Sequence, residues 1–209
     1  MEVEIPTYVF ETPATVIVSG STSCGKTQWT KRLLKHCREM MKNAPKEIYY
    51  LYGIWQEAFE EMDGVTFVEG IPSNVETLGD GKNPALVVID DQMDTALDDI
   101  RIQNLFTRTS HHRQLTVILI TQNVYAQGRY ARSIALNGQY LILFRNPRGV
   151  SQVTTLARQI GMGKTLVDAY KDATGEPYGY LVIDLHPHNH SEYKLKSKVF
   201  PGEDLVVYL

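Results

Sequence analysis

One eight-residue segment near the amino end of the chain has the residue types and spacing needed to bind a phosphate chain. Its glycines, lysine and threonine match the pattern G-x-x-x-x-G-K-[ST] at every fixed position. Glycine lets the backbone curve around an anion, so that N–H groups point at phosphate oxygens, and the start of the following helix adds partial positive charge. The lysine would contact the β- and γ-phosphates of ATP, and the threonine hydroxyl would bind Mg²⁺. The segment consists of Gly20, Ser21, Thr22, Ser23, Cys24, Gly25, Lys26 and Thr27.

Two adjacent carboxylates follow a short apolar run and could supply the metal binding and proton transfer that phosphate chemistry requires. The run Leu86–Ile89 is typical of a buried strand, and Asp90 and Asp91 follow it directly. Because ligands bind beyond the carboxyl ends of parallel strands, both acids would lie near the phosphate-binding segment. We expect Asp90 to hold Mg²⁺, commonly through water, and Asp91 to act as the general base on the attacking water.

A pair of amides follows another apolar run. The run Leu115–Ile120 predicts a central strand, and Gln122 and Asn123 lie just beyond it. Gln122 at this place could contact the terminal phosphate or the attacking water, and would then sense whether that phosphate is present. The alternative is an ordinary turn at a strand end. A further strand between the phosphate-loop strand and the acid-bearing strand is the arrangement of ATP motors and helicases.

These segments can lie together only if a sheet holds them at the same end of its strands, and the order of predicted elements indicates such a sheet. Strand-like runs alternate with helical periodicity, which predicts an α/β fold of the P-loop NTPase class, of the additional-strand, RecA-like type. Its central, mostly parallel sheet would carry helices on both faces. The predicted strands are Ala14–Ser19, Glu47–Tyr52, Val65–Val68, Ala85–Ile89, Leu115–Ile120, Tyr140–Phe144 and Tyr178–Asp184. The predicted helices are Lys26–Lys42, Trp55–Met62, Asp94–Thr107, Val150–Ile160 and Thr165–Asp172.

Composition limits the class of protein. The 209 residues, 43% of them hydrophobic, suit one domain over residues 1–209. No apolar run approaches the roughly 20 residues needed to cross a bilayer, and the acidic start lacks a secretory pattern. Cys24 and Cys37 lie 13 positions apart on the predicted helix and the loop that leads into it, too far for a disulfide bridge, which agrees with a reducing compartment. We therefore expect a soluble intracellular protein without a membrane span.

The charge is unevenly distributed. Lys and Arg number 21 and Asp and Glu 24, so the formal net charge is −3, yet no acid occurs from Ile100 to Val167. This segment could form a basic face that favours phosphate-bearing partners, with a solubilising surface as an equally weighted alternative.

The ordered set of motifs resembles the FtsK–HerA superfamily of DNA-pumping ATPases. Within it, the chain is similar to the genome-packaging ATPases of double-stranded DNA viruses and virus-like elements, of poxvirus type and Polinton type. The resemblance covers nearly the whole chain, although many relatives carry Glu at the position of Asp91. It rests on Gly20–Thr27, Val87–Met93, Leu105–Arg113, Leu119–Asn123, Phe144–Arg148 and Leu156–Gln159.

The resemblance implies an ATP-hydrolysing ring, pentameric or hexameric, that threads double-stranded DNA into a capsid. Its partners would be DNA, copies of itself and a capsid or portal-vertex protein. It would act in the nucleus or cytoplasm of the host cell and stay with the virion during packaging. In such rings an arginine of the neighbouring subunit neutralises charge on the transferred phosphoryl group. Arg108 and Arg113 are the expected fingers, Arg129 and Arg132 the alternates, and Arg145, Arg148 and Lys164 the weaker guesses for DNA contacts.

Two other functions stay open. A small-molecule or nucleotide kinase could use the same phosphate loop, although no acceptor-binding lid is recognisable. A nucleotide-gated virion assembly protein could use ATP binding to set its oligomeric state. The second G-K-T sequence, at Gly163, follows no strand and predicts a helix start. Alternating His186, His188 and His190 favour an ordinary loop over a metal site.

Overall fold

Strands that run in one direction form the centre of the molecule. The computed structural model describes residues 8–90, 93–188 and 193–209. Within them, the strands form one sheet in the order β3-β2-β4-β5-β1-β6-β7-β8-β9. The first six in that order are mutually parallel, and β7, β8 and β9 are antiparallel to their neighbours. The strands are β1 (Thr15–Ser19), β2 (Glu47–Tyr52), β3 (Val65–Glu69), β4 (Ala85–Asp90), β5 (Leu115–Thr121), β6 (Tyr140–Phe144), β7 (Tyr180–Asp184), β8 (Leu195–Ser197) and β9 (Val206–Tyr208).

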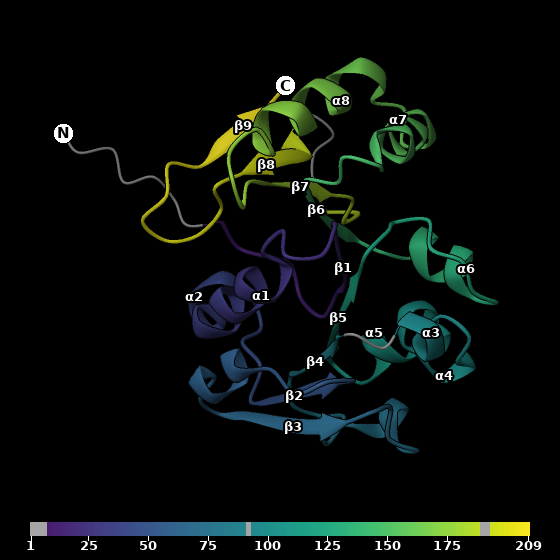
Figure 1. Cartoon of the computed structure of the whole chain (residues 1–209). Coiled ribbons are helices and arrows are strands. Elements are labelled where there is room, and N and C mark those ends of the chain that lie inside the picture. Colours follow the sequence, from purple (N-terminus) through teal and green to yellow (C-terminus); the bar gives the residue numbers. More distant parts are fainter. Residues whose placement is uncertain (1–7, 91–92, 189–192) are drawn as a thin grey trace.

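Helices cover both faces of this sheet (Figure 1). The α-helices are α1 (Lys26–Lys35), α2 (Cys37–Met40), α3 (Met93–Ala96), α4 (Ile100–Asn104), α5 (Ser110–His112), α6 (Ala131–Leu136), α7 (Val150–Gln159) and α8 (Gly163–Ala173). Short 3₁₀ turns occur at η1 (Glu57–Glu61) and η2 (Val75–Thr77), and η3 (Leu105–Thr109) is a π-helix. The predicted α/β class with a mostly parallel, two-sided sheet is confirmed.

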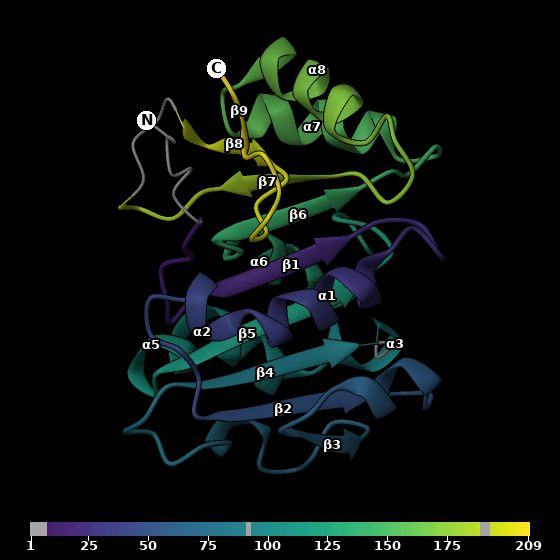
Figure 2. The same ribbon diagram turned by 90° about the vertical axis from the view of Figure 1, so that its left-hand side faces the viewer.

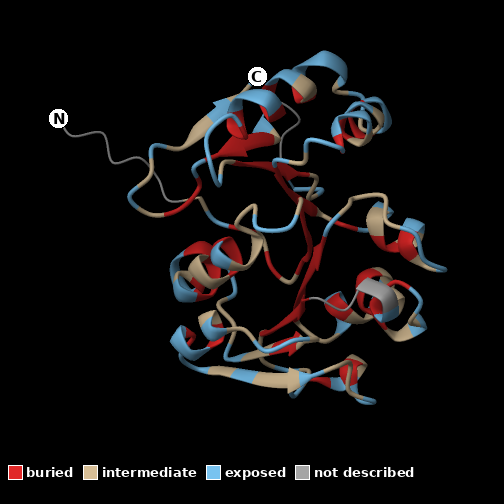
Figure 3. Ribbon diagram, in the orientation of Figure 1, coloured by how far each residue is buried: buried red, intermediate tan, exposed pale blue. Residues whose placement is uncertain are grey.

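Two hydrophobic cores, one on each face, hold the layers together. Side chains of α1 and α2 pack on one face, and those of α4, α6, α7 and α8 pack on the other. Successive residues of a central strand alternate between the cores, so that Val16 and Val18 face α1 while Ile17 faces the opposite side. Strands β1, β4, β5, β6 and β7 are buried along their whole length (Figure 3), as continuous apolar runs predict.

The helix at the start of the chain is shorter than its periodicity predicts. The apolar side chains spaced four apart are buried, as expected, but the helix stops at Lys35 and a second short helix begins at Cys37. His36 separates the two, with φ −102° and ψ 12°. The buried positions are Trp29, Leu33, Cys37 and Met41.

The predicted helix 94–107 is broken into shorter pieces because one of its own carboxylates starts a new helix. The Asp99 carboxylate accepts a hydrogen bond from the backbone N–H of Arg101 at 2.8 Å, which caps α4 at its first turn. The chain then passes through the π-helix η3 into α5, just before β5. Helix α6 and strands β8 and β9 were not predicted, because segments of three to six residues are too short to show a period.

The chain ends in an antiparallel ribbon that returns to α1. Strand β7 pairs with β6 and β8, and β9 pairs with β8, which extends the sheet beyond the parallel part. Arg32 of α1 forms an ion pair with Glu203, and its guanidinium lies 4.3 Å from the ring centroid of Phe200. None of the helices in the described ranges has the length and apolar character of a bilayer crossing.

Candidate nucleotide-binding site

The phosphate-binding segment forms a tight loop between β1 and α1. Ser23 and Gly25 have φ values of +61° and +108°, and Lys26 is the first residue of α1. A side chain at Gly20 would place a Cβ 2.6 Å from both Cys24 Sγ and Phe144 Cβ, so only glycine fits there. Both glycines of the pattern therefore have a structural reason: close packing at Gly20 and a positive φ at Gly25.

The lysine of the motif lies within this loop. Its Nζ donates hydrogen bonds to the carbonyl oxygens of Gly20 and Ser21, each at 2.8 Å. The loop is anchored to the neighbouring strands as well: the Gly20 N–H donates to Thr121 O at 3.3 Å, and the Ser21 hydroxyl donates to Arg145 O at 3.0 Å. The ammonium group is thus positioned at the loop, where a phosphate chain would be wrapped.

Asp90 ends β4 on the same face of the sheet as α1. It is 5% exposed, and its Oδ2 accepts a hydrogen bond of 2.6 Å from the hydroxyl of Tyr50 on β2. Tyr50 belongs to the hydrophobic core between the sheet and α1, so the Asp90 carboxylate that it contacts lies on the α1 face. Burial, and then the charge of Asp90, raise the pKa of the Tyr50 hydroxyl, so this phenol stays a proton donor. Asp91 lies outside the described residues.

The strand register brings the loop and the acid to one edge. Ile89 of β4 pairs with Leu119 of β5, and Leu119 pairs with Ile17 of β1, so Asp90 lies level with the last residues of β1. Strand β5 lies between the two, as predicted for the additional-strand arrangement. In Figure 2 the arrowheads of β1, β4 and β2 point to the edge where α1 begins.

Gln122 and Asn123 follow β5 at this same edge, next to a loop that sequence reasoning did not assign to the site. The side-chain amide of Asn146 donates to Asn123 Oδ1 at 3.2 Å and to Gln122 O at 3.4 Å. The backbone N–H of Asn146 in turn donates to the Tyr170 hydroxyl at 2.9 Å. Asn146 belongs to the segment Phe144–Arg148 on which the resemblance rests, and that segment could have directed attention to it.

The predicted finger arginines lie away from the phosphate loop of their own chain. Arg113 precedes β5, at the amino ends of the strands, and donates to the carbonyl oxygens of Thr77 and Gly79 at 3.2 and 3.0 Å. Arg108 is exposed on η3 and donates to Asn104 Oδ1 at 2.7 Å. A finger acts on a neighbouring subunit, so these positions leave both assignments as predictions.

The remaining basic residues are spread over the surface. The alternates Arg129 and Arg132 are exposed around the start of α6, and Arg129 lies 5.3 Å from the ring centroid of Tyr130. Arg145 and Arg148 are exposed beyond β6, next to the phosphate loop. The second G-K-T sequence begins α8 at Gly163, as predicted, and the Nζ of Lys164 lies 4.0 Å from the Asp168 carboxylate.

The histidines do not build a metal centre from the described side chains. The rings of His186 and His188 lie 5.0 Å apart, and burial lowers the pKa of His186. No group of three or more His, Cys, Asp or Glu among the described residues could hold a metal ion. His190 is outside the described residues.

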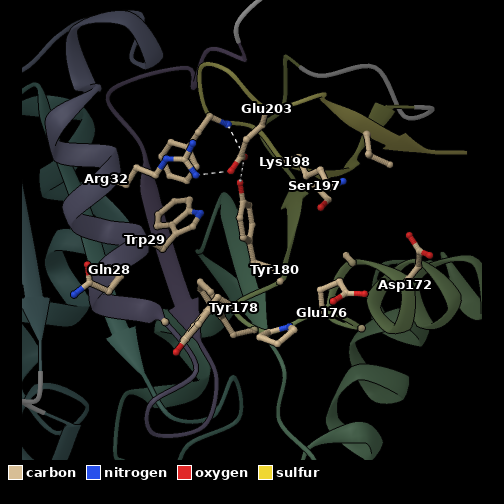
Figure 4. A pocket seen from close by; sticks show the side chains of 18 of the residues that line it. Gln28, Trp29, Arg32, Asp172, Glu176, Tyr178, Tyr180, Ser197, Lys198 and Glu203 are labelled. Carbon is tan, nitrogen blue, oxygen red and sulfur yellow. Dashed lines mark hydrogen bonds and ion pairs between the residues drawn. The ribbon is translucent and has the colours of Figure 1, made fainter.

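A cavity of about 720 Å³ opens beside the phosphate loop, between α1 and the carboxyl-terminal ribbon. Figure 4 shows side chains of α1 on one side of it and those of β7 and the adjoining loops on the other. Burial, and then the neighbouring Glu203 carboxylate, raise the pKa of Tyr180 on this wall. The labelled side chains include Gln28, Trp29, Arg32, Glu176, Tyr178, Tyr180 and Glu203.

Solved structures share this fold. The genome packaging NTPase B204 from Sulfolobus turreted icosahedral virus 2, in complex with ATP-gammaS, aligns with a TM-score of 0.55 over 94% of this chain and 97% of that chain, at 13% identity. The structure of B204 described as the DNA-packaging ATPase from Sulfolobus turreted icosahedral virus gives 0.54 over the same shares, also at 13%. The cytoplasmic domain of the type VII secretion ATPase EccC from Thermomonospora curvata gives 0.53 over 93% of this chain and 25% of that chain, at 12%.

Sequence comparison adds no nearer relative: no protein-family model and no curated protein matches the chain. At 12 to 13% identity the likeness concerns the fold. The chain has the fold of these NTPases, which agrees with the fold that the sequence resemblance implied. Membership of the FtsK–HerA superfamily and a poxvirus-type or Polinton-type origin stay predictions.

Proposed function

We propose that this chain is an ATPase that drives double-stranded DNA into a viral capsid, as one subunit of a ring. The observation that supports this most directly is the meeting of the phosphate loop and Asp90 at one edge and on one face of the sheet, with β5 between their strands. That arrangement is typical of ATP motors, and the solved genome-packaging NTPases share the fold over nearly the whole chain.

Each residue of the site has a role that its chemistry allows. The loop N–H groups and Lys26 bind and orient the β- and γ-phosphates. The Thr27 hydroxyl and the Asp90 carboxylate are oxygen donors of the kind Mg²⁺ prefers, and they lie on the α1 face of the sheet. A bound Mg²⁺ would neutralise charge on the phosphate oxygens. Gln122 orients the attacking water, and Asp91 removes its proton.

The arginine that completes the site comes from a neighbouring subunit, and we assign it to Arg108. Its guanidinium is exposed, and its hydrogen bond to Asn104 is a surface contact that a phosphate could replace. Arg113 is held by two backbone carbonyls of its own chain, which makes it the less suitable finger. Mixing Arg108→Ala subunits with Lys26→Ala subunits should restore part of the turnover that each lacks alone. No recovery would reject the assignment.

The DNA would contact the exposed arginines near the nucleotide edge, Arg145 and Arg148, with Lys164 as a further candidate. Their positive charge suits phosphates, and the Arg145 carbonyl is bonded to the phosphate loop. A capsid or portal-vertex protein would dock the ring, in the host nucleus or cytoplasm.

Phosphate release by the full chain, measured with and without duplex DNA, tests the proposal. We expect DNA to stimulate ATP hydrolysis, and native mass measurement to show a ring when an ATP analogue and DNA are present. Asp91→Asn should still bind ATP but lose hydrolysis.

Transfer of the phosphate to a small acceptor by a monomer would instead identify a kinase. Nucleotide-dependent assembly without turnover would identify an assembly protein.

A further inference from the structure

The cavity between α1 and the carboxyl-terminal ribbon begins at the phosphate loop. Gly25, which ends that loop, lines it together with Gln28 one turn into α1. We propose that this cavity receives the base of the nucleotide, and that the ring of Tyr178 stacks on that base. The inference rests on the proposed ATPase function, and it assigns a residue outside the sequence motifs to substrate recognition.

Tyr178 is in direct contact with the phosphate loop. Its Cδ1 lies 3.1 Å from the point that a Cβ on Gly25 would occupy, so the ring covers the glycine closely. Figure 4 shows Tyr180 pointing to Glu203, whereas Tyr178 points the other way, to the start of α1. A nucleotide whose phosphates occupy the loop would leave it beside α1, where the exposed ring of Tyr178 lies. Phe144 Cε1 lies 3.4 Å from the same point on Gly25, but that ring is buried.

The backbone holds Tyr178 in a conformation that side chains of its kind rarely adopt. Its φ is +62°, and the side chain is 72% exposed, so burial of the ring does not offset the strain. The turn is fixed by its neighbour: the Gly179 N–H donates to Glu176 O at 3.1 Å, and a Cβ at Gly179 would lie 2.3 Å from Ala173 O. A strained, exposed aromatic residue contributes little to folding, and such residues cluster at ligand sites.

The size and polarity of the cavity suit a nucleoside. Its volume of about 720 Å³ falls within the range of small-molecule pockets. The Gln28 amide and the Glu176 carboxylate lie on its wall. At the edge of a base, the amide can donate and accept hydrogen bonds and the carboxylate can accept them. The ion pair of Arg32 with Glu203 fixes the ribbon against α1 at the opposite end. The structure therefore offers a stacking ring, polar edges and a fixed back wall.

Affinities for two ligands distinguish binding of the base from binding of the phosphates. One ligand is ATP, and the other is inorganic tripolyphosphate, which has no base. Base–aromatic stacking is worth enough that removing the ring should weaken ATP binding roughly 5- to 100-fold. We expect Tyr178→Gly to show this loss for Mg²⁺-ATP and no change for Mg²⁺-tripolyphosphate. Tyr178→Phe should bind both like the natural chain, because the ring is kept.

Stability provides the second measurement. Glycine adopts φ values near +60° without strain, so Tyr178→Gly should melt at the same temperature as the natural chain or higher, while it binds ATP less well. Gln114→Gly is the matched control. Gln114 also has a positive φ, +54°, but precedes β5 at the opposite edge of the sheet. Its replacement should relieve similar strain and leave ATP affinity unchanged.

Three results would overturn the base site. The first is that Tyr178→Gly binds Mg²⁺-ATP as tightly as the natural chain. The second is that it loses affinity for ATP and tripolyphosphate equally, which would show a damaged phosphate loop. In both cases the ATPase proposal stands. A natural chain that binds neither ATP nor tripolyphosphate would remove the ATPase proposal and the base site together.

Discussion

Lys26 and Arg113 lie at opposite ends of the parallel strands, and each donates hydrogen bonds to two backbone carbonyls. Lys26 holds Gly20 and Ser21 at the carboxyl ends of the strands, and Arg113 holds Thr77 and Gly79 at the amino ends. The surroundings differ. Lys26 lies in a glycine-containing loop at the start of α1, whereas Arg113 packs on a surface loop with its Nε buried and without an acceptor among the described residues. The same bonding pattern therefore occurs in the proposed nucleotide site at one end of the strands and in a contact that supports the fold at the other.

Lys26→Ala should have the largest effect, and only on activity. Loss of the ammonium that contacts the phosphates should lower ATP turnover roughly 100- to 1000-fold. The free energy of unfolding should change by less than about 1 kcal/mol, because water can reach the loop carbonyls in its place. Phosphate release and urea unfolding measure the two quantities, with Lys35→Ala, at the other end of α1, as the control. Unfolding of the variant, or full turnover, would contradict the comparison.

Tyr50→Phe tests whether the Tyr50 hydroxyl positions the Asp90 carboxylate for Mg²⁺. Without the phenol, the Asp90 carboxylate loses a buried donor, and the Mg²⁺ concentration for half-maximal turnover should rise about tenfold. Nucleotide binding without Mg²⁺ should stay as it is. Tyr140→Phe serves as the control, since the buried Tyr140 hydroxyl accepts from the Glu11 N–H instead. An unchanged Mg²⁺ requirement in Tyr50→Phe would show that the hydroxyl does not position Asp90.

Arg113→Ala should show the reverse of Lys26→Ala. The loss of two hydrogen bonds from a charged donor should lower the free energy of unfolding by about 1 to 3 kcal/mol, while kcat per folded molecule stays near that of the natural chain. Chemical denaturation and active-site titration measure these separately. A drop in kcat without a loss of stability would instead restore Arg113 as a finger.

The smallest effect concerns Asp80, in the loop that Arg113 supports. Hydrogen bonds from the backbone N–H groups of Asn83 and then Lys82 lower the pKa of Asp80 to about 2. A carboxyl group whose pKa is lower in the folded chain contributes stability above its unfolded pKa, near 4. That contribution is lost as the pH falls through about 2. Asp80→Asn should flatten the acid side of the stability curve, and an NMR titration of Asp80 should give a midpoint well below 4. A midpoint near 4 would remove the effect.

Sequence reasoning could reach those parts of the site that depend on local spacing. The phosphate loop follows from a pattern in which each glycine has a backbone reason, now visible at Gly20 and Gly25. The position of Asp90 follows from an apolar run that ends in an acid. The intervening strand was expected only because it is the arrangement of ATP motors and helicases, since chain order alone does not place β5 between β4 and β1. The roles of these residues in catalysis stay predictions.

Contacts between residues far apart in the sequence could not be predicted. Tyr50 was expected only as part of the strand Glu47–Tyr52, because its bond to Asp90 depends on the pairing of β2 with β4. Tyr178 was expected to begin a strand that starts instead at Tyr180. Arg113 looked like a finger because nothing local shows that its guanidinium reaches Thr77. Each case requires the register or a loop conformation, which no periodicity encodes.

Three neighbouring strands, β5, β1 and β6, end in loops that are joined side by side. The Ser21 hydroxyl is bonded to Arg145 O, and the Asn146 amide to Asn123 Oδ1. None of the three can shift alone without breaking a bond to another. Under the proposed function, a change in how the loop holds a triphosphate would move the loop after β6, which carries the exposed guanidinium groups of Arg145 and Arg148. If the chain is the proposed motor, these bonded strand ends would directly connect the ATP phosphates with the arginines proposed to contact DNA.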